Sequence, residues 1–142
     1  MAKSSKALKA LAVVFFVSGL YDTFGGFYYM LLVGTEKSIK NPPTHVFYSY
    51  FIASFLISFA LVQFLAAFNI RRYMVVIGPI IIGRLWYAGM VFGYIFGVPG
   101  FPDDFLPTGI MDCVWSALYI VLTALSPEVK LKNLFVPCRS DG

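Results

Sequence analysis

Four long apolar stretches dominate this chain of 142 residues and leave little sequence outside them. They run from Ala10 to Val33, from Val46 to Phe68, from Met74 to Val98 and from Phe105 to Leu125. Each is long enough to cross the roughly 30 Å hydrocarbon core of a bilayer, which takes about 20 helical residues. Only 13% of the residues are charged, against about a quarter in soluble domains. The sequence therefore predicts an all-α membrane protein with four transmembrane helices and no separate soluble domain.

The connections between these stretches are short, which favours an up-down-up-down bundle of antiparallel neighbours. We expect a single transmembrane domain over residues 10–125, with residues 1–9 and 126–142 as terminal tails. Basic residues near the ends of spans are retained in the cytoplasm. With four spans, one side carries Lys3, Lys6, Lys9, Arg71, Arg72, Lys130, Lys132 and Arg139. Both termini are therefore expected in the cytoplasm, and the formal charge of +4 is a topology signal that does not indicate nucleic-acid binding.

Three charged residues, Asp22, Arg84 and Asp112, lie inside three different apolar stretches. A charge within the bilayer is costly, so it is usually paired or functional. At about 1.5 Å per helical residue, Asp22 lies roughly 20 Å above Lys9, and Arg84 roughly 18 Å above Arg72. Asp112 lies roughly 21 Å above the expected helix end at Ser126, so the three converge on one level in the outer half of the bilayer. Because the planar fork of an arginine can donate hydrogen bonds to two carboxylates, we predict a buried Asp22–Arg84–Asp112 network.

Polar and aromatic residues at helical spacing enlarge this predicted site. Positions three, four or seven residues apart share a helix face, and His45 lies at the outer end of the second stretch, where it is placed to hydrogen-bond from above. The candidate site comprises Asp22, Arg84, Asp112, His45, Tyr87, Trp115 and Tyr119. Three interpretations stay open: a static clamp between helices, a pocket for a hydrophobic ring with one polar handle, and proton-coupled chemistry or transport.

Small residues indicate where helices approach one another. In the third stretch Gly89, Gly93 and Gly97 recur every four residues and form two overlapping GxxxG units, which let another backbone come close. The partner is either a helix of the same chain or a helix of a second copy or partner subunit. Further close contacts are predicted at three glycines of the first stretch, Gly19, Gly25 and Gly26.

The sequence carries none of the motifs that mark common enzyme families. HExxH, paired Cys-x-x-Cys, the Walker loop and the dinucleotide GxGxxG unit are all missing. A single histidine excludes a haem held by two histidines of one chain. We therefore do not expect an enzymatic activity intrinsic to this chain, and the sequence names no cofactor.

Four short segments carry a resemblance to a known family. They are Gly19-Leu-Tyr-Asp22-Thr-Phe-Gly-Gly, His45-Val-Phe-Tyr-Ser-Tyr-Phe, Gly83-Arg84-Leu-Trp-Tyr and Met111-Asp112-Cys-Val-Trp-Ser-Ala-Leu-Tyr. Over residues 10–125 the chain resembles the BphX-like proteins, small four-helix bacterial membrane proteins similar to the wider DoxX-like group. The resemblance implies a multi-pass protein of the bacterial inner membrane. Some DoxX-like relatives are membrane subunits of quinone-linked oxidoreductases, which implies an accessory role in a redox assembly.

Two functions follow as hypotheses from these observations. The first is an accessory or scaffold subunit of a larger membrane assembly, held together by the Asp-Arg-Asp cluster. The alternative is a binder or permease for an aromatic or quinone-like hydrophobic compound, which would use the same cluster. The expected partners are membrane lipid, a second copy or a partner membrane subunit, and a hydrophobic small molecule.

Overall fold

The computed structural model describes residues 5–31 and 46–135, and these residues form helices joined by short turns. The long helices are α1 (Lys6–Leu31), α2 (Val46–Phe68), α3 (Ile77–Gly97) and α4 (Leu106–Ala124). Three short 3₁₀ helices accompany them: η2 (Met74–Val76), η3 (Asp103–Phe105) and η4 (Leu131–Leu134). All four long helices, with η2 and η3 included, are long and apolar enough to cross a membrane. They identify a helical, multi-pass type of membrane protein.

The helices begin and end close to the limits of the predicted spans. α2 covers the same residues as its predicted span, whereas α1 begins at Lys6, ahead of the apolar stretch. The reason is local: the Ser5 hydroxyl accepts a hydrogen bond from the backbone N–H of Leu8 at 3.1 Å. This is the contact that a serine makes at a helix N-cap, and it starts the helix before the hydrophobic run.

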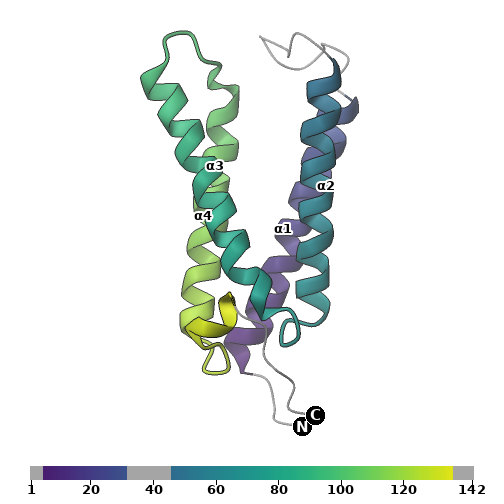
Figure 1. The fold of residues 1–142 in the computed structure, drawn as a ribbon, viewed down its shortest axis with the longest axis vertical. Coiled ribbons are helices and arrows are strands. Elements are labelled where there is room, and N and C mark those ends of the chain that lie inside the picture. Colours follow the sequence, from purple (N-terminus) through teal and green to yellow (C-terminus); the bar gives the residue numbers. More distant parts are fainter. Residues whose placement is uncertain (1–4, 32–45, 136–142) are drawn as a thin grey trace.

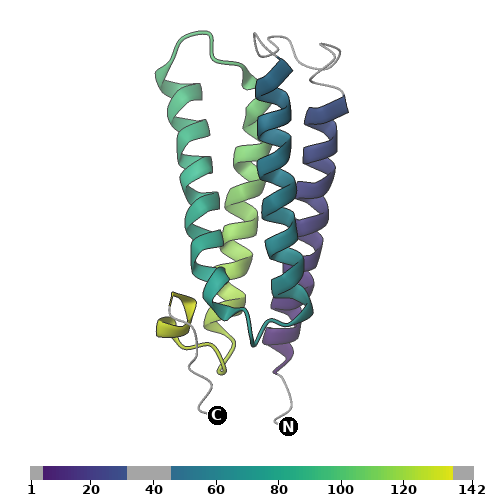
Figure 2. The same ribbon diagram turned by 45° about the vertical axis from the view of Figure 1, so that its right-hand side comes forward.

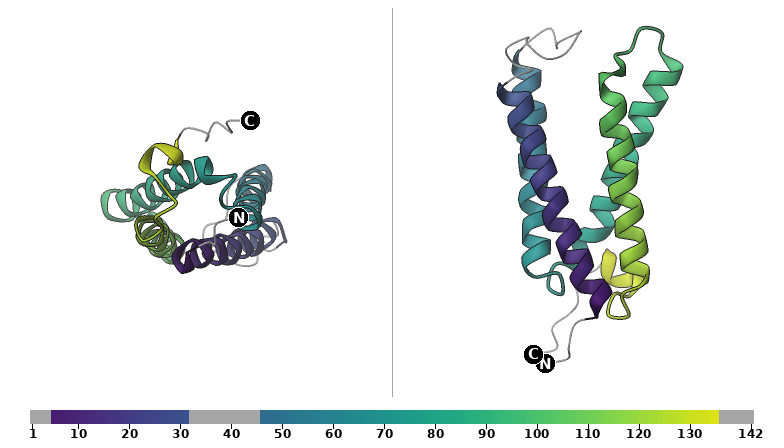
Figure 3. Two further views of the ribbon diagram at one scale, coloured as in Figure 1. Left: turned by 90° about the horizontal axis from the view of Figure 1, so that it is seen from below. Right: turned by 180° about the vertical axis from the view of Figure 1, so that it is seen from behind.

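The four helices are arranged as two pairs, α1 with α2 and α3 with α4 (Figure 1). α1 also packs against α4, whereas α2 and α3 make at most a marginal contact with each other. The pairs lie close together at the end of the bundle where α1 begins and α4 ends, which we call the closed end. They diverge toward the other end, which we call the open end (Figures 1 and 3). Figure 2 shows that the turn between α2 and α3 lies at the closed end, and the loop between α3 and α4 at the open end.

The hydrophobic core fills the closed end of the bundle. It is built from the first half of α1, the end of α2 and the turn after it, η2, the first turns of α3, the middle and later turns of α4, and η4: Leu8, Leu11, Phe15, Ala66, Ile70, Met74, Ile77, Ile80, Trp115, Tyr119 and Leu134. The rings of Phe15 and Tyr119 stack with their centroids 4.4 Å apart. Leu134, in η4, covers the base of this core. The closed half of the bundle is therefore a packed core with contributions from all four helices.

Glu128 joins the N-terminus of α1 to the segment that follows α4. Its Oε1 accepts the backbone N–H of Ser5 at 2.7 Å, and its Oε2 accepts the Ser5 hydroxyl at 2.8 Å. Arg71, in the turn after α2, lies 4.0 Å from the same carboxylate. The hydrogen bonds from Ser5 lower the pKa of Glu128 below its ordinary value, because they favour the charged form of the carboxyl group.

Glycines mark the closest approach of α1 and α2. A Cβ atom at Gly26 would lie 2.7 Å from Ile57 Cγ1 and 3.2 Å from the carbonyl oxygen of Ala53. One at Gly19 would lie 2.9 Å from the ring of Phe64. These two positions are seven residues apart and share a helix face. The predicted close contacts at Gly19 and Gly26 are present, with α2 as the partner helix.

The glycines of α3 behave differently. A Cβ atom at Gly89, Gly93 or Gly97 would meet nothing within 4 Å among the described residues. No helix of the described part of the chain packs against these glycines, because α4 lies against another face of α3. The α3–α4 contact uses Gly109 instead, where a Cβ would lie 2.9 Å from Val91 Cγ1. Contact of the three glycines with a second chain stays a prediction.

Alanine substitutions at two glycines distinguish the tight helix contact from the open one. We expect Gly26→Ala to destabilise the protein by about 1–3 kcal/mol, because the added methyl group overpacks the α1–α2 contact. Gly93→Ala adds the same methyl group in open space and should gain up to about 1 kcal/mol from helix propensity. Thermal unfolding of both variants in detergent measures the difference. Equal stability of the two would contradict the described α1–α2 packing.

The Glu128 contacts predict a stability that depends on pH. A carboxyl group whose pKa is lower in the folded protein stabilises the fold above its ordinary pKa, and this contribution is lost as the pH falls through the folded value. We expect the protection of the amides in the first turn of α1, measured as hydrogen exchange relative to the intrinsic rate at each pH, to fall as the medium becomes acidic. In Glu128→Gln this protection should be lower already at neutral pH and should respond less to acid. An unchanged profile in this variant would show that Glu128 does not hold α1.

Candidate functional site

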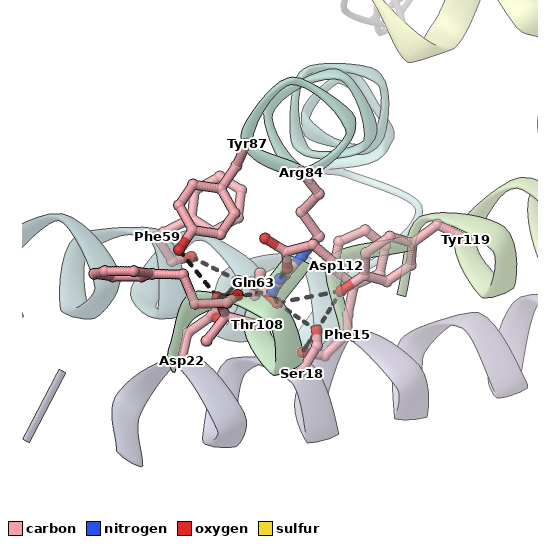
Figure 4. Close-up of polar contacts among 11 residues, drawn as sticks. Phe15, Ser18, Asp22, Phe59, Gln63, Arg84, Tyr87, Thr108, Asp112 and Tyr119 are labelled. Carbon is pink, nitrogen blue, oxygen red and sulfur yellow. Dashed lines mark hydrogen bonds and ion pairs between the residues drawn. The ribbon is translucent and has the colours of Figure 1, made fainter. Parts of the chain in front are cut away.

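The three charged residues of the apolar spans meet in one network. Arg84 of α3 lies between Asp22 of α1 and Asp112 of α4 (Figure 4). Its Nη2 donates to Asp22 Oδ2 at 2.5 Å, and its Nη1 donates to Asp112 Oδ1. The side chains of Arg84 and Asp22 are each 3% exposed, and that of Asp112 is 12% exposed. The predicted Asp22–Arg84–Asp112 contact is therefore present and buried.

Gln63 brings α2 into the same network, so that all four helices contribute a polar group. Its amide Nε2 donates to Asp22 Oδ2, and its Oε1 accepts from Arg84 Nη2 at 3.3 Å. The hydroxyls of Ser18 and Tyr119 lie within hydrogen-bonding distance of each other and of Gln63 Oε1, which accepts from this pair of hydroxyls. Gln63, Ser18 and Tyr119 are fully buried. Their hydrogen bonds satisfy groups that would be costly to bury alone.

The network separates the core from a cavity in the open half of the bundle. On the closed side, Ser18 and Tyr119 lie next to the stacked ring of Phe15. On the open side lies a cavity of about 530 Å³, within the range of ordinary small-molecule sites of about 300–1,000 Å³. Asp22, Arg84 and Asp112 line this cavity, whereas Ser18, Gln63 and Tyr119 do not. The charged residues thus form the floor of the cavity.

Aromatic side chains form a large part of the cavity wall. Of eighteen lining residues eight are aromatic: Tyr21, Tyr29, Phe55, Phe59, Tyr87, Tyr94, Phe101 and Phe105. They come from α1, α2, α3 and the segment that leads into α4. The Tyr87 hydroxyl is hydrogen-bonded to Thr108 at 3.1 Å, and Thr108 also lines the cavity. The site is therefore an apolar, aromatic chamber with a few polar groups concentrated at one end.

The other residues of the predicted site are distributed over both sides of the network. Tyr87 lines the cavity, and Tyr119 belongs to the buried hydrogen-bond network on the closed side. Trp115 does not line the cavity; its ring lies 6.1 Å from that of Tyr21, and it belongs to the core. His45 lies outside the described residues.

Sequence reasoning missed Gln63 and the size of the aromatic chamber. Gln63 is the one glutamine of the chain, and it lies inside the second apolar stretch. A primary amide in a membrane span needs hydrogen-bond partners, as a charged group does, although its burial in the bilayer costs less free energy. That signal was present in the sequence. In contrast, the cavity depends on the angle between the helix pairs, which helical spacing does not determine.

The described residues hold no group of three or more histidine, cysteine or acidic side chains that could bind a metal ion. Comparison with protein-family models, curated proteins and solved structures finds no significant match for this chain. The resemblance to BphX-like proteins therefore stays a prediction. What the site can do has to be argued from its geometry.

Removal of the guanidinium tests how the network contributes to stability. We expect Arg84→Ala to destabilise the protein by about 3–5 kcal/mol, because it leaves two carboxylates buried without their partner. The triple variant with Asp22→Asn and Asp112→Asn as well should recover most of this loss, since no buried charge remains. Arg72→Ala, which removes an exposed arginine, is the matched control. Thermal unfolding and accumulation in the membrane are the measurements, and a triple variant as unstable as Arg84→Ala would contradict a role of charge burial.

Proposed function

We propose that the protein is a multi-pass membrane protein that binds an aromatic or quinone-like hydrophobic compound in the cavity between its two helix pairs. One observation carries the proposal: a chamber with aromatic walls ends on a buried Asp-Arg-Asp floor. Small-molecule sites are typically concave and apolar with a few convergent polar groups. A clamp that served only to hold helices together would not need a cavity beside it.

The proposed orientation has both termini in the cytoplasm of a bacterial cell and the spans in its inner membrane. Among the described residues, Lys6, Lys9, Arg71, Arg72 and Lys130 lie at or near the closed end of the bundle. Asp103 and Asp104 lie at the open end. This asymmetry agrees with retention of basic residues on the cytoplasmic side. In this orientation the cavity faces the outer half of the membrane, and the core closes it toward the cytoplasm.

This geometry supports binding of a compound more than its transport across the membrane. A permease needs a route through the protein, and the core beneath the network fills the closed half of the bundle. Because α2 and α3 make little contact with each other, the cavity has a lateral side between them that faces lipid. The residues that line the cavity from these two helices on this side are Ile52, Phe55, Met90 and Tyr94. A hydrophobic compound dissolved in the bilayer would reach the chamber from that side.

An accessory or scaffold role remains a second proposal, because a separate observation favours it. The face of α3 that carries Gly89, Gly93 and Gly97 meets no other described residue, and Trp86, which is 71% exposed, lies on the same face. Glycines at this spacing suit close helix contacts in membranes. A subunit that docks there would lie outside the cavity, so the two functions are compatible.

A phenylalanine placed inside the cavity tests the binding function. A Cβ at Gly83, which lines the cavity, would approach only the Phe59 ring, at 3.9 Å. We therefore expect Gly83→Phe to fold and to occupy space that a ligand needs. Gly93→Phe adds the same side chain to the outer face of the same helix and is the matched control.

The measurement is native mass spectrometry of each protein, extracted from its own membrane in mild detergent. We expect a hydrophobic compound to accompany the wild type and Gly93→Phe, and to be lost from Gly83→Phe. A compound bound equally to all three proteins would place the ligand outside this cavity. A stoichiometric partner chain that is lost only from Gly93→Phe would support the scaffold role.

A further inference from the structure

The floor of the cavity has one more negatively charged side chain than positively charged ones. Two carboxylates, Asp22 and Asp112, face the single guanidinium of Arg84, and these three are the charged residues that line the cavity in the described part of the chain. With all three ionised, the sum is one negative charge. In a medium of low dielectric such an excess attracts a counter-charge, supplied by a proton or by a cationic group.

Arg84 is not available to an anionic ligand. Both terminal nitrogens of its guanidinium donate to carboxylates, Nη1 to Asp112 and Nη2 to Asp22. Nη2 also donates to Gln63. The fork that arginine uses to hold a carboxylate or phosphate is therefore already occupied. The guanidinium nitrogen without a hydrogen-bond partner, Nε, is buried. An anion in this cavity would therefore face two carboxylates and a guanidinium whose terminal nitrogens are already engaged.

Asp112 is the carboxylate that a ligand can reach. Its side chain is 12% exposed, against 3% for that of Asp22. Asp22 Oδ2 accepts from both Arg84 and Gln63, whereas the hydrogen bond described for Asp112 comes from Arg84 alone. Asp112 lies on α4, one turn after Thr108, which also lines the cavity. The floor therefore presents a hydrogen-bond acceptor with negative charge to the chamber.

The chamber walls suit the same kind of ligand. The eight aromatic rings offer faces with negative electrostatic potential, which attract cations when water is excluded. Arg84 itself uses this contact, since its guanidinium carbon lies 5.4 Å from the centre of the Phe59 ring. A ligand with an apolar body and a cationic head would find complementary groups at both ends.

We propose that the cavity selects lipophilic cations, such as a protonated amine on a hydrophobic ring system, with the ammonium group against Asp112 and the body among the aromatic walls. The inference rests on the proposed binding function and narrows its ligand class. An ammonium group only donates hydrogen bonds, which matches a floor that accepts them. The oxygens of a quinone only accept hydrogen bonds, so a quinone would complement the walls but not the floor.

Three probes of similar shape and different charge test this selectivity: naphthylethylamine, naphthylethanol and naphthylacetate. Their fluorescence reports binding to the full chain in nanodiscs of zwitterionic lipid, with empty nanodiscs as the baseline for partition into lipid. We expect the amine to bind the wild type about tenfold or more tightly than the alcohol, as a desolvated cation–aromatic contact and an ion pair predict. The carboxylate should bind most weakly.

Two variants locate the selectivity. Asp112→Asn removes the excess negative charge, so we expect the amine and the alcohol to bind this variant with similar affinity. Asp104→Asn makes the same charge change on an exposed residue of η3, and the difference in affinity should be preserved. Equal binding of amine and alcohol to the wild type would overturn the cation selectivity and leave the binding function standing. Binding of none of the three would contradict both proposals. The comparison within the wild type holds even if Asp112→Asn fails to fold.

Discussion

The guanidinium of Arg84 is the interaction on which the arrangement of this bundle depends. Each helix pair is held by its own internal packing, α1 with α2 and α3 with α4. Arg84 binds Asp112 within its own pair and reaches across to Asp22 and Gln63 of the other pair. Because lipid offers no competing hydrogen bonds, these contacts have few alternatives in a membrane. The network therefore fixes the level at which the pairs meet.

Much of this network could be predicted from the sequence, because charges in membrane spans are rare and their depth follows from residue counts. Asp22, Arg84 and Asp112 were placed at one level by that arithmetic, and the structure joins them by ion pairs. Gln63 was not predicted, because its side chain is uncharged and the prediction was based on charged residues alone. The hypothesis about Trp115 was less accurate, since helical spacing gives a shared face but not its boundary, and Trp115 lies on the core side.

The glycines show the same limit more clearly. The regular spacing of Gly89, Gly93 and Gly97 indicates a surface that another backbone can approach, but it does not say which backbone. The two glycines at which α1 admits α2 most closely, Gly19 and Gly26, are spaced by seven residues. Their spacing is less conspicuous than a GxxxG repeat, although it also keeps both on one helix face. Spacing thus identifies candidate contact faces, and only the fold assigns partners to them.

The cavity follows from how the chain connects its helices. At the open end residues 98–105 link α3 to α4 within one pair, and α1 and α2, the helices of the other pair, are consecutive in the chain. The α2–α3 connection, which joins the two pairs, lies at the closed end together with η4 and the Glu128 contacts. Among the described residues no connection joins the two pairs on the open side of the Arg84 network, and the cavity begins where that network ends. A ligand that contacts Asp112 touches the same carboxylate that Arg84 holds. Its binding free energy is consequently coupled to the contact between the helix pairs, because any ligand that favours one arrangement of these groups shifts the bundle toward it.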